Sequence, residues 1–355
     1  RQPVQNGPNE RGFRYSYGFS GSLDMPPYVY VKNGLATTIP EDSTVCVDTK
    51  GFWRKGLTGT DFSHADVLQH LTDKASEYIS DRSRKDQPFF LYFALSAPHT
   101  PILPAKEFMG KSNTNFYGDF VLQVDDVVGQ IVSAVEKSRT RNHTIIIFTS
   151  DNGCSPRANF SELQKVGHYP SYIFRGKKAD IYEGGHRVPF ILSWPDSVRS
   201  GSKSDAMICT TDLMATLADI LDYSLPDNAG EDSYSFLPVL KGRSDQENLR
   251  EAIVHHSLHG RFAIRRGNWK LILWPGSGGY SDNDLEGLPR FQLYNLKDDP
   301  AEEKNLVYEK PEIVAELKEL LVAYIEAGRS TPGEPQKNED MNDWPEISWI
   351  NGCNL

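Results

Sequence analysis

Apolar residues recur at helical spacing in two long segments of the first half of the chain. In residues 61–84 and again in residues 115–138, hydrophobic side chains stand three or four positions apart with polar residues between them. This spacing places the apolar side chains on one face of a helix. We therefore predict two amphipathic helices here, and a third over residues 206–223 with Asp205 as a candidate N-cap.

Short continuous apolar runs lie between these helices and have polar residues at their ends. Residues 89–95, 145–148 and 190–194 are such runs, and the second is rich in isoleucine. A β-branched run that is apolar throughout predicts a parallel strand buried on both faces. The alternation of strands and helices predicts an α/β domain over residues 1–245, with a mostly parallel sheet flanked by helices.

The pattern changes from about Asn248 onward. Short strand-like segments split by glycine and aspartate turns indicate an antiparallel sheet. Residues 311–327 follow with helical spacing and a proline at the start, which favours a helix packed on that sheet. We predict a smaller C-terminal α+β sub-domain over residues 246–355, whose polar tail from Arg329 onward extends over the surface. The predicted strands are residues 252–256, 262–265, 269–274 and 291–294.

Composition and charge exclude several classes of protein. The net charge of −10 argues against a nucleic-acid partner, and no run of 18 apolar residues is present to span a membrane. The four cysteines are too few and too scattered for a disulfide framework or a zinc cluster. Two glycosylation-type triplets, Asn142-His-Thr and Asn159-Phe-Ser, permit a secretory route, and we expect an exported protein although no signal peptide is visible.

Polar residues at the end of the isoleucine-rich run carry the first sign of chemistry. Thr149 and Ser150 follow the run at once, and Asp151, Asn152 and Gly153 come next. Ligands of α/β sheets sit beyond the carboxyl ends of the strands, and a carboxylate with an amide oxygen suits a hard cation such as Ca²⁺ or Mg²⁺. The alternative is an Asx-type turn in which Gly153 takes a positive φ.

Several motifs, taken in order, resemble those of the type I sulfatases, the arylsulfatase-like branch of the alkaline-phosphatase superfamily. The likeness covers nearly the whole chain, and its C-terminal part is similar to that family's C-terminal sub-domain. Each motif is weak singly, but the order and spacing of all of them make coincidence improbable. The motifs are residues 89–101, 149–153, 176–189, 211–217, 291–300 and 303–306.

The resemblance implies a sulfatase, a sulfuric ester hydrolase that acts on sulfate monoesters through a hydrated formylglycine bound to a divalent cation. Asp151 and Asn152 match two ligands of that cation. His99 matches the histidine near the leaving oxygen, a candidate general acid, and Lys178 matches the lysine that binds the sulfate oxygens. Lys178 is preferred to its neighbour Lys177 because the family places this lysine five residues before a glutamate, here Glu183.

Three further residues are candidates for substrate contact: His168, Arg187 and Asp24. Binding residues favour loops on a rigid scaffold, and the His168 loop lies between the cation motif and the lysine motif. The resemblance suggests a sulfated saccharide as the substrate. Alternatives stay open for each group, since His99 could cap a turn, Lys178 could be a solvated cation, and Arg187 could tie down its loop through a carboxylate.

The chain also departs from the family. It has no strand that ends in paired aspartates, no Cys-x-Pro-Ser-Arg from which formylglycine is made, and no Lys-x-His segment. The segment Cys154-Ser-Pro-Arg157 lacks the serine before its arginine and lies in the wrong motif. We therefore expect the N-terminal third of the family pattern, with the nucleophile, to be supplied by the protein's own N-terminal segment, and this chain by itself to be inactive. The alternatives are a catalytically incompetent fragment or binding module, or a superfamily phosphatase or phosphodiesterase.

Overall fold

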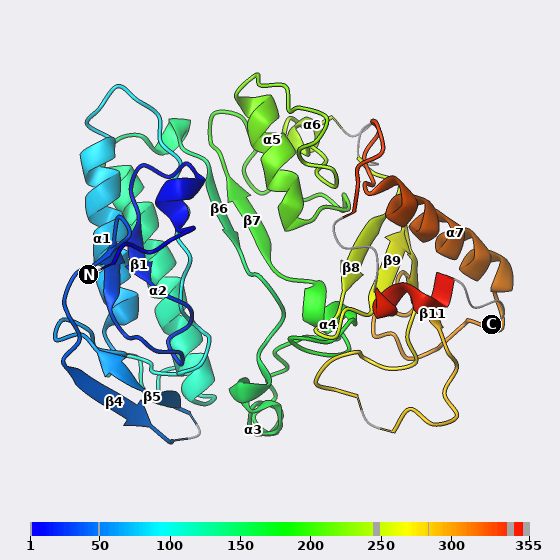
Figure 1. The fold of residues 1–355 in the computed structure, drawn as a ribbon, viewed down its shortest axis with the longest axis horizontal. Helices are drawn as coiled ribbons and strands as arrows, with labels where there is room; N and C mark the ends of the chain where they lie inside the picture. The colour runs from blue at the N-terminus through cyan, green and yellow to red at the C-terminus, as the bar shows by residue number, and fades with distance from the viewer. Residues whose placement is uncertain (1, 49, 244–248, 283, 339–343, 351–355) are drawn as a thin grey trace. The chain divides into compact units, whose positions relative to one another are not determined.

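The computed structural model forms two compact units, one of residues 1–144 and 155–170 and the other of residues 145–154 and 171–355 (Figure 1). It describes the chain apart from residues 1, 49, 244–248, 283, 339–343 and 351–355. The domain boundary predicted between residues 245 and 246 stays a prediction.

Two long helices form the larger part of the first unit. Helix α1 (Val67–Arg82) packs against α2 (Phe116–Lys137), and both confirm the segments predicted from apolar spacing. Helix α2 begins where predicted because the Asn115 side chain accepts hydrogen bonds from the backbone N–H groups of Tyr117 and Gly118. The short helices of this unit are η1 (Pro8–Arg11), η2 (Arg141–His143), η3 (Pro156–Ala158) and α3 (Phe160–Lys165).

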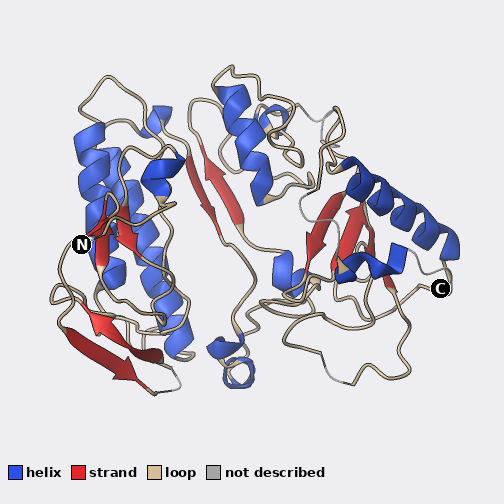
Figure 2. Cartoon of the chain, viewed as in Figure 1, coloured by secondary structure: helices blue, strands red, loops and turns tan. Residues whose placement is uncertain are grey.

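Short antiparallel strands complete the first unit (Figure 2). Its core is rich in aromatic rings: Tyr28 and Tyr30 are each 1% exposed and pack with Phe62. The His64 ring stacks on Trp53, and burial lowers the pKa of His64 to about 4. The strands are β1 (Tyr17–Phe19), β2 (Tyr30–Lys32) and β3 (Leu35–Ala36) in one sheet, and the pair β4 (Asp42–Cys46) and β5 (Trp53–Thr58).

The apolar run of residues 89–95 is not a strand, and that prediction is wrong. Phe90 is 60% exposed and Tyr92 is 72% exposed. Within the described residues, no backbone hydrogen bond joins this run to another strand. A strand exists only where a neighbour accepts and donates its ladder hydrogen bonds, and a local sequence pattern cannot guarantee that neighbour.

Strand β6 (Ile146–Thr149) pairs with β7 (Phe190–Ser193) in the second unit, and the pair is antiparallel. The expectation of a parallel strand is therefore wrong for this pair, and a mostly parallel sheet is not shown by the described strands. Thr149 lies opposite Phe190, so the chain leaves β6 and enters β7 at the same end. Both strands are half-buried at most, and Ile191 is 62% exposed.

Four antiparallel strands and one helix form the C-terminal part, as predicted. The strand order is β11-β10-β9-β8, and helix α7 (Pro311–Ala327) ends at Gly328, whose φ of 63° suits glycine. Leu271, Leu293 and Leu317 are fully buried where the helix covers one face of this sheet (Figure 1). The strands are β8 (Ile253–His256), β9 (Phe262–Arg266), β10 (Trp269–Ile272) and β11 (Gln292–Asn295).

The other face of the C-terminal sheet is covered by the loop that precedes β7. Ile181 and Tyr182 of this loop pack against Ala263, Ile272 and Tyr294 of the sheet. Side chains alternate between the two faces of a strand. Each strand therefore presents one set of residues to α7 and the alternate set to the loop.

Two segments differ from their predictions. The helix expected from residue 206 begins later, as η4 (Thr210–Asp212) and α5 (Leu213–Ile220), and Asp212 rather than Asp205 accepts a hydrogen bond at its start, from Cys209 N. The described part of the tail does not simply extend over the surface. It contains η6 (Pro345–Ile350), whose Trp349 is 4% exposed in the core beside α7, because apolar residues interrupt the polar composition. The remaining short helices are α4 (Glu183–His186) and α6 (Leu237–Leu240).

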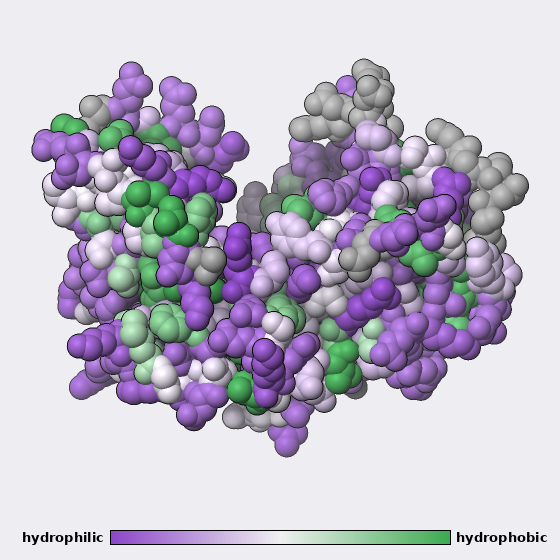
Figure 3. Space-filling model, turned by 90° about the horizontal axis from the view of Figure 1, so that it is seen from below, coloured by the Kyte–Doolittle hydropathy of each residue, from purple (hydrophilic) through white to green (hydrophobic). Residues whose placement is uncertain are grey.

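Hydrophilic residues predominate on the face drawn in Figure 3, with hydrophobic residues in scattered patches. Within the described ranges, no helix combines the length and the apolar composition that a membrane crossing requires. The described cysteines Cys46, Cys154 and Cys209 form no disulfide, and Cys353 lies outside the described residues.

Glycines bring the loop after β6 against the loop before β7. Gly153 N donates to Gly185 O at 2.9 Å, and Gly184 N donates to Arg175 O at 2.7 Å. A Cβ atom on Gly153 would lie 1.9 Å from Gly184 O, and one on Gly185 would lie 2.1 Å from Asp180 O. Only residues without a side chain allow backbones to approach this closely. The two loops are thus locked together by their main chains.

We predict that Gly153→Ala destabilises the protein by about 3 kcal/mol, since the new methyl group meets backbone that cannot rotate away. Urea unfolding of the complete protein measures the change. Gly129→Ala is the matched control, because a Cβ there meets nothing within 4 Å in helix α2, and it should leave stability unchanged or raise it by about 0.5–1 kcal/mol. Equal unfolding midpoints for the two variants would contradict the close packing of the loops.

Candidate active site

Asp151 and Asn152 follow β6 after Ser150 and lie in the loop that the glycine contacts hold in place. Asp151 is exposed, and no hydrogen bond or ion pair of its carboxylate is present among the described residues. Asn152 is half-buried, and its Nδ2 donates to Gly153 O at 3.2 Å. This bond orients the amide, so that its Oδ1 and the Asp151 carboxylate are the oxygens left to accept at this edge.

Lys178 lies in the neighbouring loop, where its backbone N donates to Cys154 O at 2.9 Å. The buried carboxylate of Asp180 fixes this turn by accepting hydrogen bonds from Lys177 N and from both the backbone and the hydroxyl of Ser281. The Lys178 side chain is half-buried, and among the described residues no carboxylate pairs with it. Lys178 therefore lies beside the Asp151 loop with an uncompensated ammonium group.

Three of the predicted residues belong to the first unit. His99 is exposed, and its Nδ1 lies 2.7 Å from Thr100 O. His168 is exposed on the turn after α3, and Asp24 forms an ion pair with Arg54 at 2.7 Å. Their convergence with Asp151 and Lys178 on one cleft stays a prediction.

Arg187 directs its guanidinium toward two groups of its own unit. It lies 3.6 Å from Glu183 Oε2 and 4.7 Å from the centre of the Phe174 ring. The ion pair agrees with the alternative that Arg187 ties down its loop through a carboxylate. Half of its side chain is still exposed, and contact with substrate stays a prediction.

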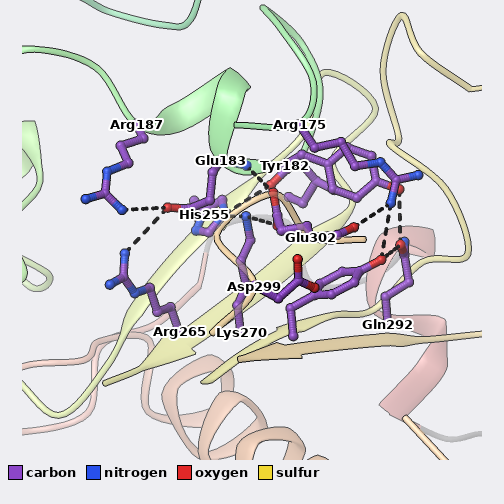
Figure 4. A network of polar contacts seen from close by, with 12 residues as sticks. Arg175, Tyr182, Glu183, Arg187, His255, Arg265, Lys270, Gln292, Asp299 and Glu302 are labelled. Carbon is purple, nitrogen blue, oxygen red and sulfur yellow. Dashed lines mark hydrogen bonds and ion pairs between the residues drawn. The ribbon is translucent and has the colours of Figure 1, made fainter. Parts of the chain in front are cut away.

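Beneath the lysine loop, the structure places a buried ion cluster that the sequence analysis missed (Figure 4). Lys270 of β10 is fully buried, and its Nζ lies 3.1 Å from Glu183 Oε1 and 2.8 Å from Glu302 Oε1. Glu302 Oε2 accepts a hydrogen bond from Glu183 N at 2.6 Å, and Arg265 lies 3.6 Å from Glu183 Oε2. The one available signal was a lysine between apolar neighbours in a strand, Trp269-Lys-Leu-Ile272.

Burial and the neighbouring cations act in opposite directions on these carboxylates. Burial tends to raise the pKa of Glu183, but Lys270 and Arg265 outweigh it and hold that pKa below its usual value. Burial dominates at Glu302 and raises its pKa despite Lys270. Burial and the charge of Lys270 lower the pKa of His186 to about 4 and that of His255 well below its usual range, so both rings are neutral at pH 7.

The oxygens of Asp151 and Asn152 fit a hard cation in kind but not in number. Ca²⁺ takes six to eight oxygen ligands, and two adjacent residues supply only part of that set. No group of three or more histidine, cysteine, aspartate or glutamate residues that could hold a metal is present in the part of the chain that the structure describes. The two residues can therefore serve only as a partial cation site.

Comparison with known proteins identifies the family. The family model described as Sulfatase matches residues 5–223, and the model described as N-sulphoglucosamine sulphohydrolase, C-terminal, matches residues 174–327. The loops of Asp151 and Lys178 lie within the first match, and the C-terminal sheet with α7 lies within the second.

Curated relatives and solved structures agree with these matches. An N-acetylgalactosamine-6-O-sulfatase of Bacteroides thetaiotaomicron is 32% identical, over 87% of this chain and 68% of the relative. Human steryl-sulfatase is 34% identical over 55% of this chain and 33% of the relative. A structure from work on the metabolism of multiple glycosaminoglycans by Bacteroides thetaiotaomicron has a TM-score of 0.78 and 30% identity, covering 90% of this chain and 74% of the other.

The chain spans 33% of the length of human steryl-sulfatase, 55% of mouse N-acetylgalactosamine-6-sulfatase and 68% of the bacterial relative. Since the Sulfatase model matches more than half of the chain, and since a relative of 32% identity extends over most of it, this chain belongs to the sulfatase family.

Proposed function

We propose that the protein is a sulfuric ester hydrolase that cleaves sulfate monoesters of a saccharide. The observation that supports this most is the backbone lock between two loops, in which Gly153 N donates to Gly185 O and Lys178 N donates to Cys154 O. These bonds hold, on adjacent loops, oxygen ligands for a cation and an ammonium group that pairs with no carboxylate among the described residues. The oxygens of a sulfate monoester carry negative charge, which a bound cation and an ammonium group both stabilise.

Each candidate site residue has a proposed role. Lys178 binds the sulfate oxygens and stabilises the charge that they carry in the transition state. His99 donates a proton to the leaving oxygen, and because its Nδ1 lies against Thr100 O, its Nε2 is the atom free to do so. Asp24, His168 and Arg187 contact the sugar around the scissile bond.

Asp151 and Asn152 hold a divalent cation, Ca²⁺ or Mg²⁺, in this proposal. In sulfatases a formylglycine residue, made from the cysteine of Cys-x-Pro-Ser-Arg, would supply the oxygen nucleophile, and that motif is absent from the 355 residues. We propose that the protein's own N-terminal segment contributes that residue together with the remaining cation ligands. Export from the cytoplasm, which the family resemblance suggests, is part of the same proposal.

The substrate class rests on the named relatives. Those named N-acetylgalactosamine-6-sulfatases include proteins from a bacterium, mouse, pig, rat and human. We therefore propose a sulfated saccharide as the substrate and N-acetylgalactosamine 6-sulfate as the first compound to test. The steryl and aryl sulfatases among the relatives make an aryl sulfate a useful general probe.

We predict that the 355-residue chain alone releases no sulfate above background from an aryl sulfate, whereas the complete gene product turns it over. The reason is the missing nucleophile. Without it, the loops of Lys178 and Asp151 can bind the sulfate ester but cannot cleave it. Sulfate release measured by ion chromatography decides between the two. Turnover by the isolated chain would show that the nucleophile lies within these residues, and inactivity of both would favour a binding module. Release of phosphate from an aryl phosphate alone would indicate a superfamily phosphatase.

In the complete protein, Lys178→Ala should lower kcat/KM for the aryl sulfate by about 10²- to 10³-fold, as loss of a charge that stabilises the transition state does elsewhere. Lys137→Ala at the exposed end of α2 is the control and should have no effect. Steady-state kinetics with both variants gives the ratio. Activity within twofold of the parent in Lys178→Ala would remove this residue from the site.

Asp151→Asn in the complete protein should weaken Ca²⁺ binding at least about tenfold, since cation affinity follows the number and charge of the ligands. Isothermal titration of the metal-free protein measures the affinity directly and needs no turnover. Asp125→Asn, an exposed carboxylate of α2, is the matched control and should bind as the parent does. Unchanged affinity in Asp151→Asn would place the cation elsewhere.

A further inference from the structure

We propose that the buried cluster of Lys270, Glu183 and Glu302 positions Lys178 for substrate, so that the C-terminal sheet takes part in the reaction without touching the sulfate. This inference rests on the proposed function of Lys178. It assigns a positioning role to residues that lie beneath the candidate site, on the face of the sheet opposite α7.

The sheet places the cluster by strand register. Lys270 pairs with Arg265 of β9 on one side and with Tyr294 of β11 on the other, so the three side chains stand in one row. The adjacent row of side chains lies on the opposite face of the sheet. It includes Ile264, Leu271 and Leu293, is apolar and packs on α7. Because side chains alternate, the Lys270 row must face the lysine loop.

Glu302 is itself held rigidly. It is fully buried, its φ is 55°, and its backbone O accepts a hydrogen bond from Arg175 at 3.0 Å. The turn before it is closed by Asp299, whose carboxylate accepts from the N–H groups of Glu303 and Lys304. A carboxylate on such a turn is a fixed anchor for whatever binds it.

The anchor reaches the lysine loop through Glu183. Glu302 binds the backbone N of Glu183, and Lys270 binds the Glu183 side chain, so both ends of this residue are fixed. The next two residues are the glycines whose backbones lie against Gly176, Asp180 and Gly153. A shift of Glu183 therefore displaces the backbone of these glycines, which is too closely packed to adjust. Lys178 lies in the same loop, between Gly176 and Asp180, so it shifts as well.

Stability alone does not explain why these charges are buried. A well-packed apolar cluster of similar volume is often as stable as a buried ion pair or more so. What the ion pairs add is a defined position for Glu183, whose carboxylate lies 3.1 Å from Lys270 and 3.6 Å from Arg265.

The test is a double-mutant cycle in the complete protein with an aryl sulfate as the probe. Lys270→Met should lower kcat/KM by about 10- to 100-fold, in line with other residues that hold a catalytic group in place. In the Lys178→Ala background the same change should cost less than about twofold, because Lys178 is no longer there to position. Glu302→Gln, which keeps an acceptor for Glu183 N, is the second variant should Lys270→Met fail to fold.

Arg250→Met is the matched control. Arg250 is a buried cation of the same unit that pairs with Asp212, outside the lysine loop. Its replacement should lower the melting temperature and leave kcat/KM per folded molecule unchanged. The proposal is wrong if Lys270→Met or Glu302→Gln behaves like this control. It is also wrong if the variant lowers kcat/KM by the same factor in the Lys178→Ala background as in the parent, because the cluster is then only structural.

Hydrogen exchange separates this proposal from the proposed function. In Lys270→Met or Glu302→Gln, the amides of Lys178, Gly184 and Gly185 should exchange faster than in the parent, while those of α7 should not change. If the parent protein proves inactive on sulfate esters, the proposed function fails. Local loosening of the loop would then still support the positioning of Lys178, and unchanged exchange would overturn it.

Discussion

The second unit depends on one buried ammonium group. Lys270 is fully enclosed, and a charge so enclosed is tolerated only where carboxylates surround it. Its two partners, Glu183 and Glu302, come from segments far apart in the chain, a loop before β7 and a turn after β11. Sheet, loop and turn must therefore come together at the same place, and the ion cluster fixes how the loop lies on the sheet.

The contacts that connect this ion cluster to the loop of Asp151 are made by the main chain rather than by side chains. Glu183 is followed by two glycines, and their backbones contact the loop of Gly153 at distances that exclude any Cβ atom. Asp151 and Asn152 follow strand β6 and lie on that second loop. Side chains that bind a cation or an anion need a support that does not yield, and close backbone packing is such a support.

Two lysines of one small region illustrate how surroundings assign a role. Lys270 is enclosed, paired with two carboxylates and removed from solvent. Lys178 is half-buried and has no carboxylate partner among the described residues. The first therefore serves to hold structure, and the second is the residue to which we assign the sulfate oxygens. In a protein of net charge −10, the proposed function requires such local positive charge for an anionic sulfate to approach.

The sequence by itself determined the elements whose stabilising pattern is local. Apolar spacing located α1, α2 and α7, short segments split by glycine and aspartate turns located the four C-terminal strands, and ordered motifs identified the family. Tertiary structure alone decided what depends on distant partners. The run at 89–95 has no strand neighbour among the described residues, β7 turned out antiparallel to β6, and Trp349 of a polar tail is buried. The cross-strand neighbours of Lys270, Arg265 and Tyr294, followed from the register of β9, β10 and β11, because one strand pattern does not encode which residues lie across it.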